Sequence, residues 1–162
     1  MVSKIESNKE LRFRFKGLVD LDSLYKNVQN WMSSHGYLFD ESVHKFKPPE
    51  LELSWVGERK NTGYRKTILK LEFHFWDYKE VLVKKDGVEK TMVSCHFIVD
   101  ISGCQEYDYE NKYTSDFMKK LQNFMHRFIL YYKINVIWDD EPYNEIYQLL
   151  DVVKSVTKPS IG

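Results

Sequence analysis

The most regular hydrophobic pattern in the chain runs from Thr67 to Asp77. In this segment Leu69, Leu71, Phe73 and Phe75 alternate with Lys70, Glu72, His74 and Trp76. Successive side chains of a strand point to opposite faces of a sheet, so the pattern predicts a central strand with one buried face and one face toward water. The buried face needs a cover, and the segments that supply it decide the fold.

Further alternating segments predict an antiparallel sheet around this strand. The first is 11–16, where Leu11, Phe13 and Phe15 alternate with Arg12, Arg14 and Lys16 before Gly17. Other extended segments are expected at 37–46, 51–55, 81–83 and 92–103. Asp86-Gly87 lies between the last two and is typical of a tight hairpin, because both central residues of that turn take positive φ.

Three amphipathic helices are predicted, over 20–36, 114–132 and 142–156, from apolar residues spaced three and four apart. The second has a wider apolar stripe than one partner needs, so we expect it to lie across the sheet and to contact another element as well. The predicted order is β-α-β-β-β-β-β-α-α. It describes an α+β domain over 10–157, in which a meander of about six antiparallel strands has one face covered by three helices. Residues 1–9 are predicted to be a polar arm, and 158–162 a short tail.

Composition narrows the class of protein. Lys plus Arg and Asp plus Glu each number 24 in the 162 residues, so no net charge attracts nucleic acid or an anionic membrane. No segment approaches the run of about 18 apolar residues that a membrane-spanning helix needs. The amino terminus lacks the apolar run of a signal peptide. We therefore expect a soluble protein that is not secreted by that route.

The two cysteines predict a reducing compartment. Cys95 and Cys104 would lie roughly 30 Å apart along one extended strand, whereas a disulfide needs Cα atoms within about 7 Å. Only a sharp chain reversal would permit a bridge. Cys95 shares the inward parity of Phe97 and Val99 and is expected to be a buried free thiol. This favours the cytoplasm, or a virus particle assembled there.

No reactive motif is present in the sequence. There is no glycine-rich phosphate loop, no HExxH or HxH arrangement and no CxxC pair. We therefore predict no enzymatic activity, no cofactor and no metal site. His74 and His96 share the outward parity of two strands; directly opposite each other they could share a metal or a proton, although two surface histidines are the favoured interpretation.

Aromatic residues are the one compositional excess, at 15% of the chain with four Trp, eleven Tyr and ten Phe. Rings outside the core stripe can anchor an interface, stack on nucleic-acid bases, line a ligand cavity or be covered by a loop of the same chain. The candidates for an interaction surface are His74, Trp76, Tyr78, His96 and Trp138.

Scattered positions along residues 13–153 carry a resemblance to a family. They are Asp20, Leu21, Tyr25, Trp31, Gly36, Tyr37, Trp55, Tyr64, Val81, Val83, Asp86, Gly87, Asp108 and Tyr109. In these positions the chain resembles a family of small uncharacterised proteins from archaea and environmental sequences. The resemblance implies a single domain. It transfers no activity, because the family has none assigned.

Three functions remain open at this stage. The first is a non-enzymatic structural or interaction protein, a building block or adaptor whose partners are identical or different protein subunits, for example in a virus particle. The second is a small-molecule carrier with a cavity between sheet and helices, broadly like START-type helix-grip domains. The third is a weak nucleic-acid-binding module that uses Arg12, Arg14, Lys16 and the turn at Lys84 and Lys85, against which the neutral net charge argues.

Overall fold

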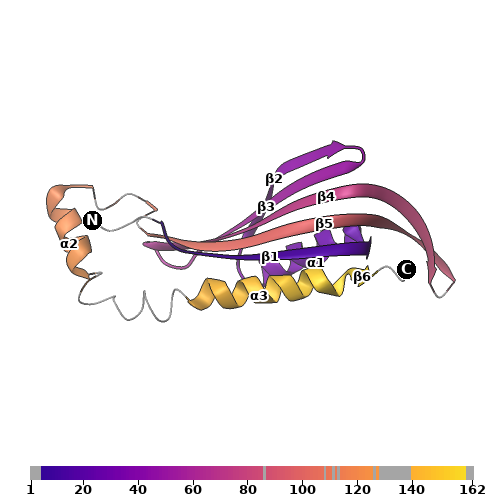
Figure 1. Cartoon of the computed structure of the whole chain (residues 1–162). Helices are drawn as coiled ribbons and strands as arrows, with labels where there is room; N and C mark the ends of the chain where they lie inside the picture. Colours follow the sequence, from indigo (N-terminus) through magenta and orange to yellow (C-terminus); the bar gives the residue numbers. More distant parts are fainter. Residues whose placement is uncertain are drawn as a thin grey trace.

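The protein is an α+β domain built on one antiparallel sheet (Figure 1). The computed structural model describes residues 5–85, 87–107, 109–110, 112, 114–125, 127 and 140–159. In chain order the elements are β1 (Ile5–Val19), α1 (Leu21–Ser34), β2 (Leu38–Lys47), β3 (Glu50–Lys60), β4 (Arg65–Lys85), β5 (Val88–Tyr107), α2 (Asp116–Phe124), α3 (Asp140–Ser155) and β6 (Thr157–Pro159).

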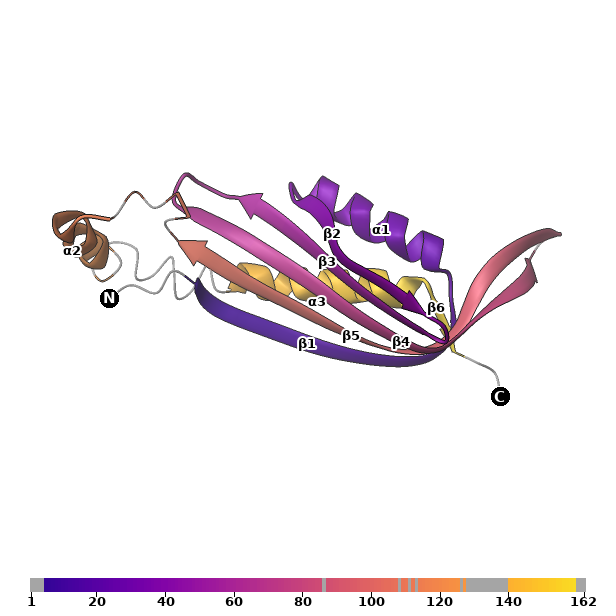
Figure 2. The ribbon, with the colours of Figure 1, turned by 90° about the horizontal axis from the view of Figure 1, so that it is seen from above.

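The described strands lie in the order β2-β3-β4-β5-β1-β6, each antiparallel to its neighbour. The alternation that predicted the central strand is confirmed, because Leu69, Leu71, Phe73 and Phe75 are all buried on one face of β4. β4 and β5 form a long hairpin. Its tip extends beyond the other strands as a two-stranded ribbon that bends away from the sheet (Figures 1 and 2).

Several strand boundaries differ from the prediction. β1 begins at Ile5, which pairs with Glu106, so part of the predicted polar arm belongs to the sheet. β4 is one continuous strand where two were expected, because an irregularity at Asp77 breaks the alternation without ending the pairing. β6 follows α3 and pairs with β1 over Gly17 to Val19, where a tail was expected. Three residues are too few to show a period-two pattern in the sequence.

α1 and α3 cover one face of the sheet (Figures 1 and 2). Each buries an apolar stripe against it, as the spacing predicts: Leu24, Val28 and Met32 from α1, and Ile146, Leu149 and Val153 from α3. These side chains join the inward residues of the strands in one hydrophobic core. The opposite face of the sheet carries neither helix.

α2 does not lie across the sheet as expected. It is found beyond the ends of the strands, and the side chain of Phe117 is 74% exposed (Figure 1). The apolar spacing correctly indicates a helix with a hydrophobic stripe, but it does not identify what the stripe packs against. The apolar stripe predicted for this helix consists of Phe117, Leu121, Phe124, Phe128 and Tyr131. Its last two residues fall outside the described residues.

An N-terminal cap and a close approach to β3 position α1 on the sheet. Asp20 caps its first turn by accepting hydrogen bonds from the backbone N–H and the hydroxyl of Ser23. Burial alone would raise the pKa of Asp20, but the hydrogen bonds from Lys90 and Ser23 outweigh it and leave the pKa lowered. Gly57 of β3 gives α1 room, because a Cβ at this position would lie 2.6 Å from the sulfur of Met32.

Candidate interaction surface

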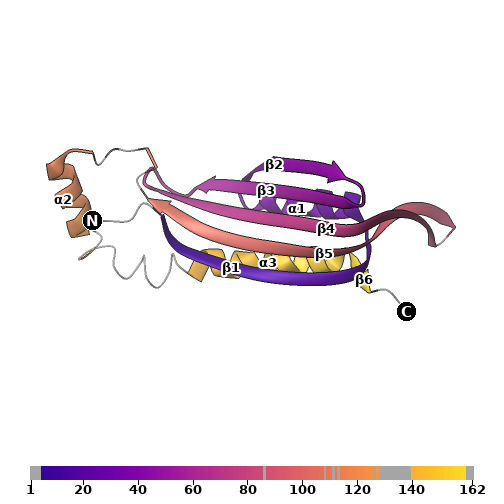
Figure 3. The same ribbon diagram turned by 45° about the horizontal axis from the view of Figure 1, so that its top comes forward.

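The face of the sheet opposite α1 and α3 is turned toward the viewer in Figure 3. Side chains on this face line a hollow. The hollow has a volume of about 500 Å³ and is lined by side chains from five strands, among them Arg12, Val43, Lys70, Glu72, Trp76 and Ile98. We call the set Arg12, Val43, Lys70, Glu72, His74, Trp76, His96, Ile98 and Asp100 the outer-face surface. Its side chains reach this face because they occupy the parity opposite to the buried core positions.

Trp76 is the aromatic centre of the outer-face surface. Its indole stacks on the imidazole of His74 with ring centroids 4.1 Å apart and an interplanar angle of 18°. The centroid of the Trp76 ring also lies 5.5 Å from the centroid of the His96 ring, because Trp76 of β4 and His96 of β5 are directly opposite each other in the sheet. Three of the five residues that the sequence suggested for an interaction surface, His74, Trp76 and His96, therefore lie together.

The register separates the two histidines. His74 is opposite Ile98, while His96 is opposite Trp76. The two histidines are therefore not directly opposite each other, which was the condition for their rings to share a metal or a proton. Over the described residues, no group of three or more His, Cys, Asp or Glu side chains is placed to hold a metal ion.

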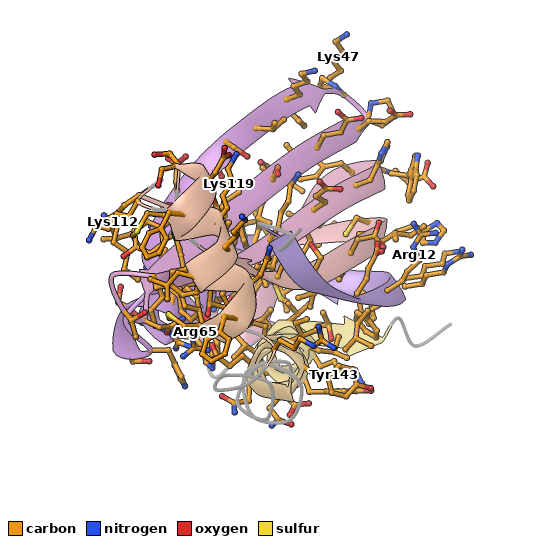
Figure 4. The ribbon with its side chains drawn as sticks, turned by 90° about the vertical axis from the view of Figure 1, so that its left-hand side faces the viewer. Arg12, Lys47, Arg65, Lys112, Lys119 and Tyr143 are labelled. Carbon is orange, nitrogen blue, oxygen red and sulfur yellow. The ribbon has the colours of Figure 1, made fainter. Side chains whose placement is uncertain are left out.

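The hollow is lined by two basic side chains, Arg12 and Lys70, and by three acidic ones, Glu52, Glu72 and Asp100. Both basic side chains are paired within the chain. The guanidinium of Arg12 donates two hydrogen bonds to the carboxylate of Asp100, at 2.7 and 3.1 Å. Figure 4 shows Arg12 projecting outward from β1. Lys70 pairs with Glu72 at 2.7 Å. Because these pairs are exposed to solvent, they add little to the stability of the fold, and their main effect is to set the charge pattern of this face.

Tyr78 is not part of this surface, contrary to the prediction. Two residues of β4, Asp77 and Tyr78, are opposite one residue of β5, and Asp77 has φ of 52°. This β-bulge turns Tyr78 to the helix-covered side, where it packs against the core and its ring lies 5.1 Å from Phe46. Burial raises the pKa of its hydroxyl. Trp138, the remaining candidate, lies outside the described residues.

Sequence reasoning missed two apolar members of the surface, Val43 and Ile98. Ile98 has the same parity as His96 and Asp100 on β5, so the alternation contained the signal. Val43 follows an irregularity in the pairing of β2 with β3, between Glu41 and Val43. An extra residue in one strand changes which face the following side chains occupy, and counting from the sequence cannot detect it.

The cysteines are free and lie at positions of opposite parity on β5. Cys95 is 4% exposed, and burial raises the pKa of its thiol to about 12. Cys104 is only partly buried, although burial and Glu106 raise its pKa as well. The prediction of a buried free thiol at Cys95 is confirmed.

Alkylation by iodoacetamide is expected to distinguish the two thiols. Only the thiolate reacts, so at about pH 8 Cys104 should be labelled first, and faster as the pH rises toward its pKa. Cys95 should stay unlabelled until urea unfolds the chain. Peptide mass spectrometry measures both rates, and equal labelling of the two residues in the folded protein would contradict their placement.

The chain matches no protein-family model and no curated protein sequence. Over the described residues, none of the helices has the length and apolar character needed to cross a membrane.

Proposed function

We propose that this chain is a non-enzymatic structural or interaction protein, a building block or adaptor of a larger assembly, which binds another protein subunit through the outer-face surface. The observation that carries the proposal is the hollow lined by Trp76 on the sheet face that lacks α1 and α3. A face that only needed hydration would not require a tryptophan and an isoleucine at its centre.

The composition of the surface supports a protein partner. Interfaces typically have an aromatic or aliphatic centre and a polar rim, and tryptophan is enriched among the residues that contribute most binding energy. Here Trp76, Val43 and Ile98 supply the centre, and the pairs Arg12–Asp100 and Lys70–Glu72 supply the rim. Rim charges of both signs favour one orientation of a partner more than they add affinity.

The other two functions have less support. A helix-grip carrier needs a cavity between sheet and helices, but buried side chains of β3, β4, β5, α1 and α3 pack together there, and the hollow lies on the other face. Nucleic-acid binding needs an excess of positive charge, whereas the hollow is lined by three acidic and two basic side chains.

A matched pair of tryptophan variants tests the proposal. Trp31 of α1 stacks on His35 with centroids 4.0 Å apart at 18°, nearly the geometry of Trp76 on His74, but it lies on the helix-covered side. We expect Trp76→Ala to weaken binding of a co-purifying subunit by at least about 30-fold, the effect of losing one interface hot spot. Trp31→Ala should leave that binding unchanged.

The experiment compares the three proteins in extracts of the native cell and measures the dissociation constant of the retained subunit. Thermal unfolding identifies any variant that fails to fold. Equal binding by wild type and Trp76→Ala contradicts the proposed surface. Light scattering after size-exclusion chromatography tests the wider proposal: a monomer of 19.5 kDa that retains no partner would contradict a role in an assembly.

A further inference from the structure

β1 has a long open edge. One side of the strand pairs with β5 from Ile5 to Val19, whereas the other pairs with β6 only at Gly17, Leu18 and Val19. No other strand of the described chain pairs with the outer edge of residues 5–16, and β1 is the outermost long strand (Figures 2 and 3). At about 3.3 Å per residue this edge is roughly 40 Å long. Its backbone N–H and C=O groups are available to another strand.

Over residues 10–16 the exposed side chains of this edge are Glu10, Arg12, Arg14 and Lys16, three of which are cationic. Arg12 is already engaged by Asp100, but Arg14 and Lys16 form no ion pair with the described residues. The opposite edge of the sheet differs, because β2 carries Asp40 and Glu41 as well as Lys45 and Lys47. Its pairing with β3 is also irregular near Ser42, which discourages a further strand. The pairing of β1 has its own irregularity, between Glu6 and Lys9, but it is regular from Lys9 to Val19. The two edges therefore differ in charge, and the regular part of the β1 edge is Lys9 to Lys16.

The other side of β1 offers apolar contact. Leu11, Phe13 and Phe15 are only partly buried at the margin of the core. The rings of Phe13 and Phe15 lie 6.1 and 5.5 Å from the ring of Phe97, and the ammonium of Lys154 lies 5.4 Å from the centre of the Phe13 ring. An added strand would bring one set of its side chains beside Arg14 and Lys16 and the alternate set beside these rings.

We propose that the free edge of β1 binds an extended segment of a partner protein, in which acidic and apolar residues alternate, as an additional antiparallel strand. Backbone hydrogen bonds supply the attachment, and the two sets of side chains select the sequence. A second copy of this chain has no net charge complementarity: paired antiparallel about Phe13, it would put Arg12 opposite Arg14 twice, which is destabilising, and Glu10 opposite Lys16 twice, which is stabilising.

The test uses the full chain and a synthetic peptide of about nine residues, of strand length, that alternates glutamate and valine. We expect it to bind, and the double variant Arg14→Glu/Lys16→Glu to bind it about tenfold more weakly, because two attractions become repulsions. A peptide that alternates lysine and valine should bind that variant better than it binds wild type. The matched control is Lys45→Glu/Lys47→Glu on β2, which should leave binding unchanged.

Backbone chemistry provides a second readout. Methylation of the alternate backbone nitrogens of the synthetic peptide that would face β1 should abolish binding, because these nitrogens can then no longer donate hydrogen bonds to the carbonyl groups of β1. The proposal is overturned if no glutamate–valine peptide binds, if the lysine–valine peptide binds wild type equally well, or if the β2 control has the same effect as the β1 variant. A dimer that forms without peptide and is dispersed by it would assign the edge to a second copy.

The edge adjoins the outer-face surface, since Arg14 pairs with Ile98 and Lys16 pairs with His96. An added strand would attach to the backbone of β1 and not to the hollow, so the inference does not rest on the proposed function. Trp76→Ala, which should remove the partner of the outer-face surface, is expected to leave peptide binding intact. Loss of peptide binding in Trp76→Ala but not in Arg14→Glu/Lys16→Glu would place the peptide on the outer face and overturn the assignment to β1.

Discussion

Replacing Trp55 by alanine is expected to lower the free energy of unfolding by about 3–5 kcal/mol, the range for removing a large aromatic side chain from a packed core. Trp55 is fully buried between sheet and α1, with ring centroids 5.0 Å from Tyr25 and 4.9 Å from Phe73. Its indole N–H also donates to a carboxylate oxygen of Glu41 at 2.7 Å. The substitution therefore leaves a cavity and removes a charge-assisted hydrogen bond.

Urea denaturation followed by circular dichroism measures this loss. Trp55→Phe is the informative control: it keeps most of the apolar volume and removes the indole N–H, so it should cost clearly less than Trp55→Ala. A loss below about 1.5 kcal/mol for Trp55→Ala would be typical of a partly exposed side chain. It would contradict the packing of α1 over β3.

Replacing Arg59 by methionine is expected to destabilise the fold by about 3–5 kcal/mol, because it leaves the carboxylate of Glu145 buried without its partner. The guanidinium of Arg59 lies 2.7 Å from Glu145 of α3, and both side chains are largely buried. It also donates to the backbone carbonyl of His35 at the end of α1 and to the side chain of Asn61. One side chain of β3 thus holds both covering helices.

A double-mutant cycle distinguishes this account from a simple loss of packing. If the cost of Arg59→Met comes from an unpaired buried charge, adding Glu145→Leu should restore part of the stability. Chemical denaturation of the two single variants and the double variant gives the coupling free energy. Purely additive losses would show that the ion pair does not join β3 to α3 in solution.

Most helices and strands, and the faces they bury, can be predicted from the sequence, whereas the order of the strands and the placement of α2 cannot. Alternation from Leu69 to Phe75 identifies the buried face of β4, and three- and four-residue spacing identifies the faces that α1 and α3 bury. These are local patterns with a direct physical cause. Strand order and the placement of α2 depend on contacts between segments far apart in the chain, and no local pattern records them.

Irregular positions explain why the outer face was only partly predicted. The outward placement predicted for His74, Trp76 and His96 is confirmed, because regular alternation places all three on one face; their role in an interface stays a prediction. It fails at Tyr78 because the bulge at Asp77 adds one residue to β4, and a single extra residue exchanges the two faces.

The outer-face surface is tested most directly by site-specific photo-cross-linking in extracts of the native cell. A photoreactive phenylalanine analogue replaces His96, which is exposed on the outer face, or Asn30, which is exposed on α1. The proposed function predicts a covalent adduct with another protein subunit from position 96 and none from position 30. An adduct from position 30 alone would contradict it and place the interface on the helix-covered side.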